Sequence, residues 1–101
     1  AFGAVKTARL HGLAVPEDIS MVGFDDQTTA AFYNPPLTTI HTPCREIGRR
    51  ATQELIELIA GHDGSREIVV GTKLIVRDST ASPRAGRGTL AQKVKSARAR
   101  G

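Results

Sequence analysis

Two adjacent aspartates, Asp25 and Asp26, directly follow the apolar segment Ile19–Phe24. That segment is short and β-branched at its ends, which predicts a buried strand. In open parallel α/β sheets, ligands bind beyond the carboxyl ends of the strands, where Asp25 would lie. A carboxylate there can accept hydrogen bonds from the hydroxyl groups of a sugar or the N–H groups of a nucleobase. Two alternatives remain: either aspartate could cap the following turn, or both could bind a metal, although no third oxygen ligand lies at loop spacing.

His41 and Cys44 are the other side chains whose chemistry and spacing invite a catalytic interpretation. A nucleophile and its base must lie within hydrogen-bond reach and need an orienting group. These two residues straddle an expected strand-to-helix joint, and no third partner is evident. A structural zinc site requires four ligands, whereas this chain has 1 Cys and 3 scattered His. We therefore predict no catalytic residues, no metal site and no cofactor, and expect that the chain is not an enzyme.

The elements that would position these residues alternate between helix and strand. Val5 and Ala8 recur at helical spacing in a helix expected over Ala1–Leu13, and Pro16 lies in the turn before the strand that ends at Phe24. A helix, a short loop and a strand in this order form an α/β unit. The elements expected after it are a short helix or loop over 27–34, a strand over Leu37–His41, a helix over 43–60, and a strand over Glu67–Val76 that Gly71 could bend.

The helix over 43–60 is the element with the strongest sequence support. Thr42 can serve as its N-cap, and Pro43 suits the first helical position. Charged pairs at (i, i+4) spacing, Glu46 with Arg50 and Arg50 with Glu54, favour a solvent-facing side. The opposite side is apolar, which predicts that it packs against another element. Its residues are Ile47, Ala51, Leu55, Leu58 and Ile59.

The formal net charge of +4 is distributed unevenly. Residues 84–101 hold six basic side chains and no acid, which leaves residues 1–83 with a net charge of −2. A strongly basic chain is typical of nucleic-acid binding, but here the excess lies in a segment of low apolar content. We predict that residues 82–101 form a disordered tail. The alternative is a weak helix, with Leu90 and Val94 on one side, that touches phosphates without specificity.

Length and composition restrict the number of domains and the expected cellular location. A chain of 101 residues with 40% hydrophobic content allows one domain at most. No apolar run reaches the roughly 18–20 residues that a membrane span needs, and the start does not have the pattern of a signal peptide. A single Cys cannot build a disulfide framework, so a reducing, cytoplasmic location is expected. The chain starts inside a helical pattern without an initiator Met, as a fragment would.

Two motifs in order carry a resemblance to a known family. Taken together, Val15–Asp26 and Asn34–Ile40 resemble the carboxyl-terminal third of the sensor domain of lactose/galactose-repressor (LacI/GalR) family transcriptional regulators. The segments Ile47–Ala51 and Leu74–Thr80 also fit the family pattern. The resemblance divides the chain into a partial effector-binding and dimerisation domain, residues 1–81, and a basic tail, residues 82–101, that lies outside the match.

The resemblance implies an α/β fold: part of a two-lobed, periplasmic-binding-protein-like (type I) architecture with a parallel sheet. Family members bind a small-molecule effector, typically a sugar or related metabolite, between the lobes. They bind DNA through an amino-terminal helix-turn-helix domain that this chain lacks. The chain would form part of the second lobe up to about Ile40, the helix Arg45–Ile59 would lie on the first lobe, and the strand Glu67–Val76 would run back across the hinge.

The resemblance also implies roles for individual residues. Asp25 matches the effector-contacting aspartate, and Thr42 and Cys44 match hinge positions that face the effector. A further stretch matches the surface through which the full-length parent would form a homodimer. The dimer-interface residues expected from it are Phe32, Tyr33, Leu37 and Thr38.

The sequence leaves two other interpretations of the chain's function open. A solute-binding protein of a sugar transporter would have a similar fold, and the upstream sequence would distinguish it by a signal peptide. A truncated product without independent function is also compatible with the length. Half of a cleft cannot enclose a ligand, and a core this small is marginal. We therefore expect little specific DNA or sugar binding from the isolated chain.

Overall fold

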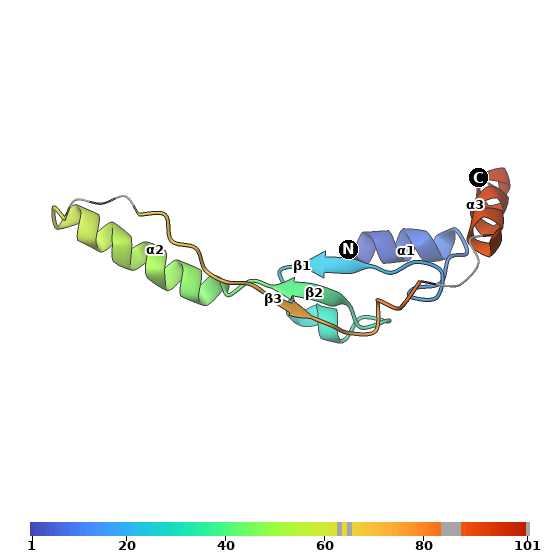
Figure 1. Ribbon diagram of the computed structural model, residues 1–101, viewed down its shortest axis with the longest axis horizontal. Helices are drawn as coiled ribbons and strands as arrows, with labels where there is room; N and C mark the ends of the chain where they lie inside the picture. The colour runs from blue at the N-terminus through green and yellow to red at the C-terminus, as the bar shows by residue number, and fades with distance from the viewer. Residues whose placement is uncertain (63, 65, 84–87, 101) are drawn as a thin grey trace.

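The computed structural model of the chain describes residues 1–62, 64, 66–83 and 88–100. Helices and short strands alternate along most of its length (Figure 1). In chain order the elements are α1 (Phe2–Leu10), β1 (Val22–Phe24), a short 3-10 helix (Thr28–Ala31), β2 (Thr38–His41), α2 (Cys44–Ile59), β3 (Lys73–Ile75) and α3 (Gly88–Arg100).

The three strands form one sheet in the order β1-β2-β3. β1 and β2 run parallel, with Gly23 opposite Thr39. β2 and β3 run antiparallel, with Ile40 opposite Leu74. The family resemblance implies a parallel sheet, and the sheet of this chain is mixed. The reason is the path of the chain: β2 leads outward to α2, and β3 returns from it.

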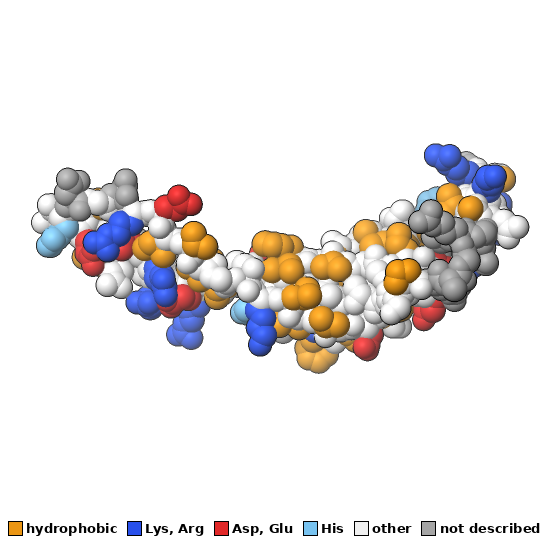
Figure 2. All heavy atoms as spheres, viewed as in Figure 1, with side chains coloured by type: hydrophobic (Ala, Val, Ile, Leu, Met, Phe, Trp, Pro, Cys, Tyr) orange, Lys and Arg blue, Asp and Glu red, His pale blue; other side chains and the backbone are white. Residues whose placement is uncertain are grey.

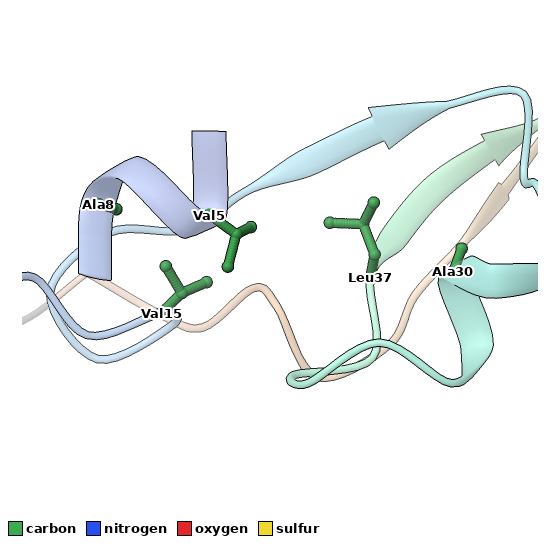
Figure 3. Close-up of a cluster of buried hydrophobic side chains, with 5 residues drawn as sticks. All are labelled: Val5, Ala8, Val15, Ala30 and Leu37. Atoms are coloured by element: carbon green, nitrogen blue, oxygen red, sulfur yellow. The ribbon is translucent and has the colours of Figure 1, made fainter. Parts of the chain in front are cut away.

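A small apolar core lies between α1 and the sheet (Figure 3). Val5 and Ala8 of α1 are buried there, as their spacing predicts. Leu37, directly before β2, is buried at 3% exposure and packs in the same cluster. The cluster is completed by Val15 and Ala30, with Phe2, Leu13, Met21 and Tyr33 partly buried around it.

β1 is not the buried strand that its apolar residues predict. Val22 is 56% exposed and Phe24 is 66% exposed. Gly23 between them faces the core, where a Cβ atom at this position would lie 2.8 Å from Leu37 Cδ2. Because successive side chains of a strand point to opposite faces, Val22 and Phe24 face away from the core. Within the described residues no element covers that outer face.

α2 projects from the rest of the molecule (Figure 1). Its bounds agree with the prediction to within a residue, but Pro43 rather than Thr42 occupies the N-cap position, without a side-chain cap. None of its residues is buried, and its apolar side is open to solvent, with Leu55 at 56% and Ile59 at 77% exposure (Figure 2). The molecule is therefore long and narrow, 64 × 24 × 24 Å.

The last strand is much shorter than its sequence predicts. The β-prone residues of Glu67–Val76 predict about ten residues of strand, but only Lys73–Ile75 pair with β2. Residues 66–72 run back beside α2 without a strand partner among the described residues (Figure 1). β-propensity describes how well side chains fit a pleated surface, and here no neighbouring strand supplies one.

The basic tail also differs from expectation. The composition of residues 82–101 predicts disorder, with a weak helix as the alternative. Gly88–Arg100 form a helix, α3, while residues 84–87 and 101 lie outside the described residues. Lys93 Nζ of α3 lies 2.7 Å from Asp18 Oδ2, and the Asp18 side chain is only 2% exposed. Val94 lines an apolar hollow together with Ala4 and Ala8 of α1. α3 therefore contacts the body beside α1. No helix in the described part of the chain is long and apolar enough to cross a bilayer.

Candidate functional site

A surface hollow of about 620 Å³ lies at the junction of the sheet and α2. It brings together three residues that the sequence nominates for effector binding: Asp25, which follows β1, and Thr42 and Cys44, at the junction of β2 and α2. The remaining lining residues come from the same junction and the first turns of α2. They are His41, Pro43, Arg45, Glu46 and Arg49.

The turn after β1 has an unusual backbone that sets the direction of Asp25. Asp25 has φ = 78° and Asp26 has φ = 45°, so two successive non-glycine residues adopt left-handed conformations. Aspartate tolerates this region better than most residues because its short polar side chain can hydrogen-bond locally. The turn leaves Asp25 exposed on the hollow while Asp26 is partly buried. The Asp25 carboxylate is thus available as a hydrogen-bond acceptor for a polar ligand.

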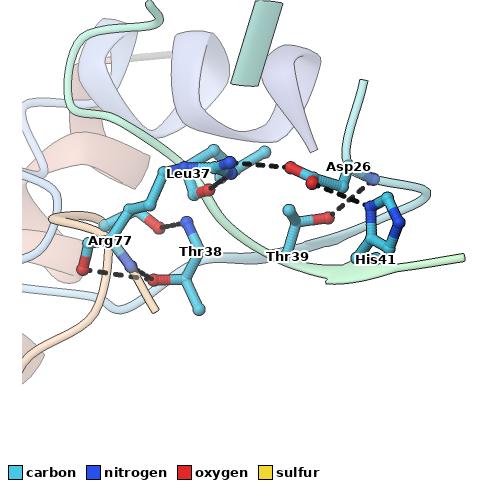
Figure 4. Close-up of polar contacts among 7 residues, drawn as sticks. Asp26, Leu37, Thr38, Thr39, His41 and Arg77 are labelled. Atoms are coloured by element: carbon cyan, nitrogen blue, oxygen red, sulfur yellow. Dashed lines mark hydrogen bonds and ion pairs between the residues drawn. The ribbon is translucent and has the colours of Figure 1, made fainter. Parts of the chain in front are cut away.

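Asp26 is held by contacts from three directions (Figure 4). Arg77 Nη2 donates to Asp26 Oδ1 at 2.8 Å, and His41 Nδ1 lies 3.1 Å from Asp26 Oδ2. The Asp26 amide donates to Thr39 Oγ1 at 3.2 Å. The Arg77 hydrogen bond holds the pKa of the Asp26 carboxyl below its ordinary value, and the His41 contact adds to this effect. Asp26 is therefore an ionised hydrogen-bond acceptor with a structural role. The structural role that the sequence left open for it was that of a turn cap.

The segment after β3 is tied to the sheet by further hydrogen bonds (Figure 4). Arg77 Nη1 donates to the Leu37 carbonyl at 2.9 Å, and the Arg77 amide donates to Thr38 Oγ1 at 2.9 Å. Ser79 is fully buried. Its hydroxyl accepts from the Thr38 amide at 2.8 Å and donates to the Met21 carbonyl at 2.6 Å. The segment thus joins β1 to β2.

Sequence reasoning missed the roles of Arg77 and Ser79. Both lie in the segment Leu74–Thr80, which fits the family pattern as a whole but has no local pattern that singles out either residue. Arg77 and Asp26 are 51 residues apart, and no periodic pattern relates them. The signal that could have found the pair is the presence of one arginine in a β-prone segment, close to the end of the last expected strand.

Thr42 and Cys44 offer different groups to the hollow. Thr42 Oγ1 is buried and has no hydrogen-bond partner among the described residues, so it can donate to or accept from a ligand that reaches it. Cys44 is exposed with a free thiol, and its amide donates to the Thr42 carbonyl at 2.8 Å. The Thr42 hydroxyl suits a ligand that carries hydroxyl groups, whereas the Cys44 thiol is only a weak donor and acceptor.

The expected dimer-interface residues do not share one surface. Leu37 and Thr38 are 3% and 2% exposed, so the chain itself covers them, and their prediction as contacts to a partner is corrected. Tyr33 is partly buried against Phe2, with ring centroids 4.6 Å apart, and its hydroxyl donates to the Phe2 carbonyl. Phe32 is 85% exposed. The interface prediction therefore depends mainly on Phe32.

No group of three or more His, Cys, Asp or Glu side chains in the described part of the chain could hold a metal ion. His41 and Cys44 both line the hollow, but the hydrogen bond that the structure gives His41 goes to Asp26. The groups that line the hollow can bind a polar ligand through hydrogen bonds and charge.

The sequence of the chain is similar to a known domain family and to known regulators. The sequence pattern of the periplasmic binding protein-like domain matches residues 1–80. The transcriptional regulator MalR of Streptomyces coelicolor is 46% identical over 89 residues, which are 87% of this chain and 26% of that regulator. The chain therefore spans about a quarter of that relative's length.

Solved structures of two regulators share the fold. A lac repressor dimer bound to operator and the anti-inducer ONPF superposes with a TM-score of 0.76 at 34% identity, over 81% of this chain and 29% of that one. The regulator CelR in complex with cellobiose superposes with a TM-score of 0.70 at 36% identity, over 75% of this chain and 24% of that one. The likeness thus covers most of this chain but a minor part of each neighbour.

Proposed function

We propose a function from the premise that the chain belongs to the periplasmic binding protein-like domain family, whose pattern matches residues 1–80. Its relatives are LacI-family transcriptional regulators. We infer that the chain is the effector-sensing and dimerising portion of such a regulator, from the carboxyl-terminal third of the sensor domain. The ligand would be a sugar or a related metabolite that carries hydroxyl groups.

The observation that carries this proposal is the hollow between the sheet and α2. Asp25, Thr42 and Cys44 line it together, although 17 positions or more separate Asp25 from the other two in the sequence. A carboxylate, and a buried hydroxyl that has no partner among the described residues, are groups that bind hydroxyl-rich ligands by hydrogen bonds. In the complete protein a second wall would enclose this hollow, which is open here.

The mechanism would be a change in the closure of two lobes. The body around the sheet would belong to one lobe and α2 to the other, with its apolar side packed on the rest of that lobe. Two crossings of the chain connect them, one before α2 and one between α2 and β3 (Figure 1). Effector binding would favour one closure state and so alter the spacing of DNA-binding heads in a homodimer. The regulator would act in the cytoplasm and contact DNA through an amino-terminal domain outside this chain.

The test uses the complete gene product that contains this sequence. A thermal-shift screen against mono- and disaccharides, with cellobiose among them, identifies a sugar that binds, and calorimetry measures its affinity. We expect Asp25→Ala to weaken binding of that sugar by roughly tenfold or more, because a carboxylate hydrogen bond to the ligand is lost. Affinity for operator DNA should stay within about twofold.

Asp78→Ala is the matched control. Asp78 is an exposed aspartate near the end of another strand, and the hydrogen bond that the structure gives it uses only its backbone amide. It should leave sugar affinity unchanged. Equal sugar affinity in the Asp25→Ala and unmodified proteins, or no response to any sugar in the screen, would contradict the proposed site.

A further inference from the structure

We propose that Arg77 is a positioning residue for the effector site: through Asp26 it fixes the turn that presents the Asp25 carboxylate to the hollow. This inference rests on the proposed function for its consequence, but its structural part can be tested without a ligand. Arg77 does not line the hollow, so its effect must pass through other residues.

The backbone of the turn needs an external restraint. Asp25 and Asp26 are both left-handed, with φ of 78° and 45°. Non-glycine residues visit this region singly rather than in succession, and such conformations persist only where the surroundings fix them. The direction of the Asp25 side chain follows from these dihedrals, so whatever fixes the turn also fixes Asp25.

Asp26 supplies that restraint because its side chain and its amide are both held. Its two carboxylate oxygens contact Arg77 Nη2 at 2.8 Å and His41 Nδ1 at 3.1 Å. Its amide donates to Thr39 Oγ1. The Asp26 and Arg77 side chains are 16% and 20% exposed, so this ion pair is screened less by solvent than a surface pair.

Arg77 is itself a fixed anchor. Its second guanidinium nitrogen donates to the Leu37 carbonyl at 2.9 Å, and its amide donates to Thr38 Oγ1 at 2.9 Å. Leu37 and Thr38 are buried, so the guanidinium fork connects Asp26 to the core (Figure 4). A planar fork can make both contacts at once, whereas a lysine ammonium could make one of them well.

The two contacts to the Asp26 carboxylate come from the two chain segments that connect the body to α2. His41 is the last residue of β2, directly before the outward crossing, and Arg77 follows β3 after the return crossing. The position of Asp25 therefore depends on both connections between the body and α2. This couples the expected ligand contact to the geometry of the junction.

Hydrogen exchange in the complete gene product tests the structural part. We expect Arg77→Ala to raise exchange of the peptide spanning residues 23–27 by roughly tenfold or more, while residues 38–41 keep their protection. Arg77→Lys should restore part of the protection, because one charged donor remains. Lys73→Ala is the control, since Lys73 is an exposed cation on β3. Unchanged exchange of residues 23–27 in Arg77→Ala would overturn the proposal.

A double-mutant cycle tests the consequence for binding, using the sugar with the highest affinity in the screen described above. Arg77→Ala should weaken that affinity by roughly tenfold in the unmodified background and by less than about twofold in the Asp25→Ala background, because a positioning effect disappears with the group it positions. Equal losses in both backgrounds would show an independent, purely structural effect and overturn the proposal. If Asp25→Ala itself has no effect on affinity, the proposed function fails, while the exchange result still decides the role of Arg77.

Discussion

Asp25 and Asp26 carry the same side chain but differ in what surrounds their carboxylates. The carboxylate of Asp26 is ionised and occupied by Arg77 and His41, whereas Asp25 is exposed on the hollow. A substitution at Asp26 should therefore act on the local structure, and one at Asp25 on ligand binding. In the proposed site, Asp26 would thus hold the turn and Asp25 would bind the ligand.

Gly23, two residues before Asp25, allows the close approach of β1 to the core. A Cβ atom there would lie 2.8 Å from Leu37 Cδ2 and 3.3 Å from Ala1 Cβ. Leu37 is buried and has little room to move. We expect Gly23→Ala to destabilise the complete gene product by about 1–3 kcal/mol, the cost of overpacking a core. The urea denaturation midpoint measures the effect.

Gly48 offers a matched control with the opposite sign. It lies within α2, and a Cβ atom there meets nothing within 4 Å. Glycine inside a helix is less favourable than alanine, so Gly48→Ala should stabilise the protein by about 0.5–1 kcal/mol. If both substitutions moved the midpoint in the same direction, steric overlap at Gly23 would not be the operative cause.

At the scale of elements, the first turns of α2 are organised around one glutamate. Glu46 Oε1 accepts from Arg50 Nε at 2.6 Å and from Arg49 Nη2 at 2.8 Å. Among the described residues, Arg50 pairs with Glu46 and not with Glu54. The hydrogen bonds from Arg49 and then Arg50 lower the pKa of the Glu46 carboxyl from its ordinary value of 4.5 to about 2.

This depressed pKa predicts a pH dependence with a definite sign. A group whose pKa is lower in the folded state stabilises that state above its unfolded pKa. The contribution of Glu46 should therefore be complete above pH 4.5 and be lost as the pH falls toward about 2. Carboxyl ¹³C NMR of Glu46 should give a titration midpoint near 2. The contribution to stability is small, because the three side chains are 36–59% exposed.

Two arginine variants test the assignment of that shift. Arg49→Gln removes the largest cause and should move the Glu46 midpoint up toward 4.5. Arg45→Gln removes a cation from the same turn of α2 that the structure does not pair with Glu46, and it should leave the midpoint nearly unchanged. A midpoint already near 4.5 in the unmodified protein would contradict the ion-pair geometry.

The elements that depend on local signals could be predicted from the sequence. Val5 and Ala8 define the buried side of α1 at helical spacing, and Pro43 marks the start of α2. The predictions that were wrong concern the burial and the pairing of an element, which depend on its neighbours. Val22 and Phe24 predict burial but are exposed, and Glu67–Val76 predicts a long strand of which only Lys73–Ile75 find a partner. Burial and pairing depend on neighbours that a local pattern does not contain.

The residues of the candidate site also divide into those that the sequence could nominate and those that it could not. Asp25 could be nominated because it follows a strand, and Thr42 and Cys44 because a family resemblance marks them. Arg77 could not be nominated, since its contact with Asp26 spans 51 positions and depends on the return of the chain from α2. A position after a strand can be recognised from the local sequence, whereas a contact across 51 positions depends on the three-dimensional path of the chain.

The shape of the whole molecule carries a consequence for its stability. The Cα radius of gyration is 20.3 Å, whereas a compact domain of this size has about 13 Å. The excess arises because α2 extends away from a body whose buried hydrophobic side chains are few. Apolar side chains are open to solvent on both α2 and β1, with Ile59 at 77% and Phe24 at 66% exposure. Such surfaces favour association or a covering element.

We therefore expect the isolated 101-residue chain to unfold without a sharp thermal transition and to bind the dye ANS, because little apolar area is removed from water on folding. Circular dichroism at 222 nm during heating and ANS fluorescence measure the two properties. The complete gene product is the control and should melt cooperatively with little dye binding, since additional elements would cover α2 and β1. A cooperative melt of a monomeric 101-residue chain with no ANS signal would show that the exposed apolar surfaces need no cover. In that case α2 would not have to pack on a first lobe, and the two-lobe arrangement would lose its main energetic support.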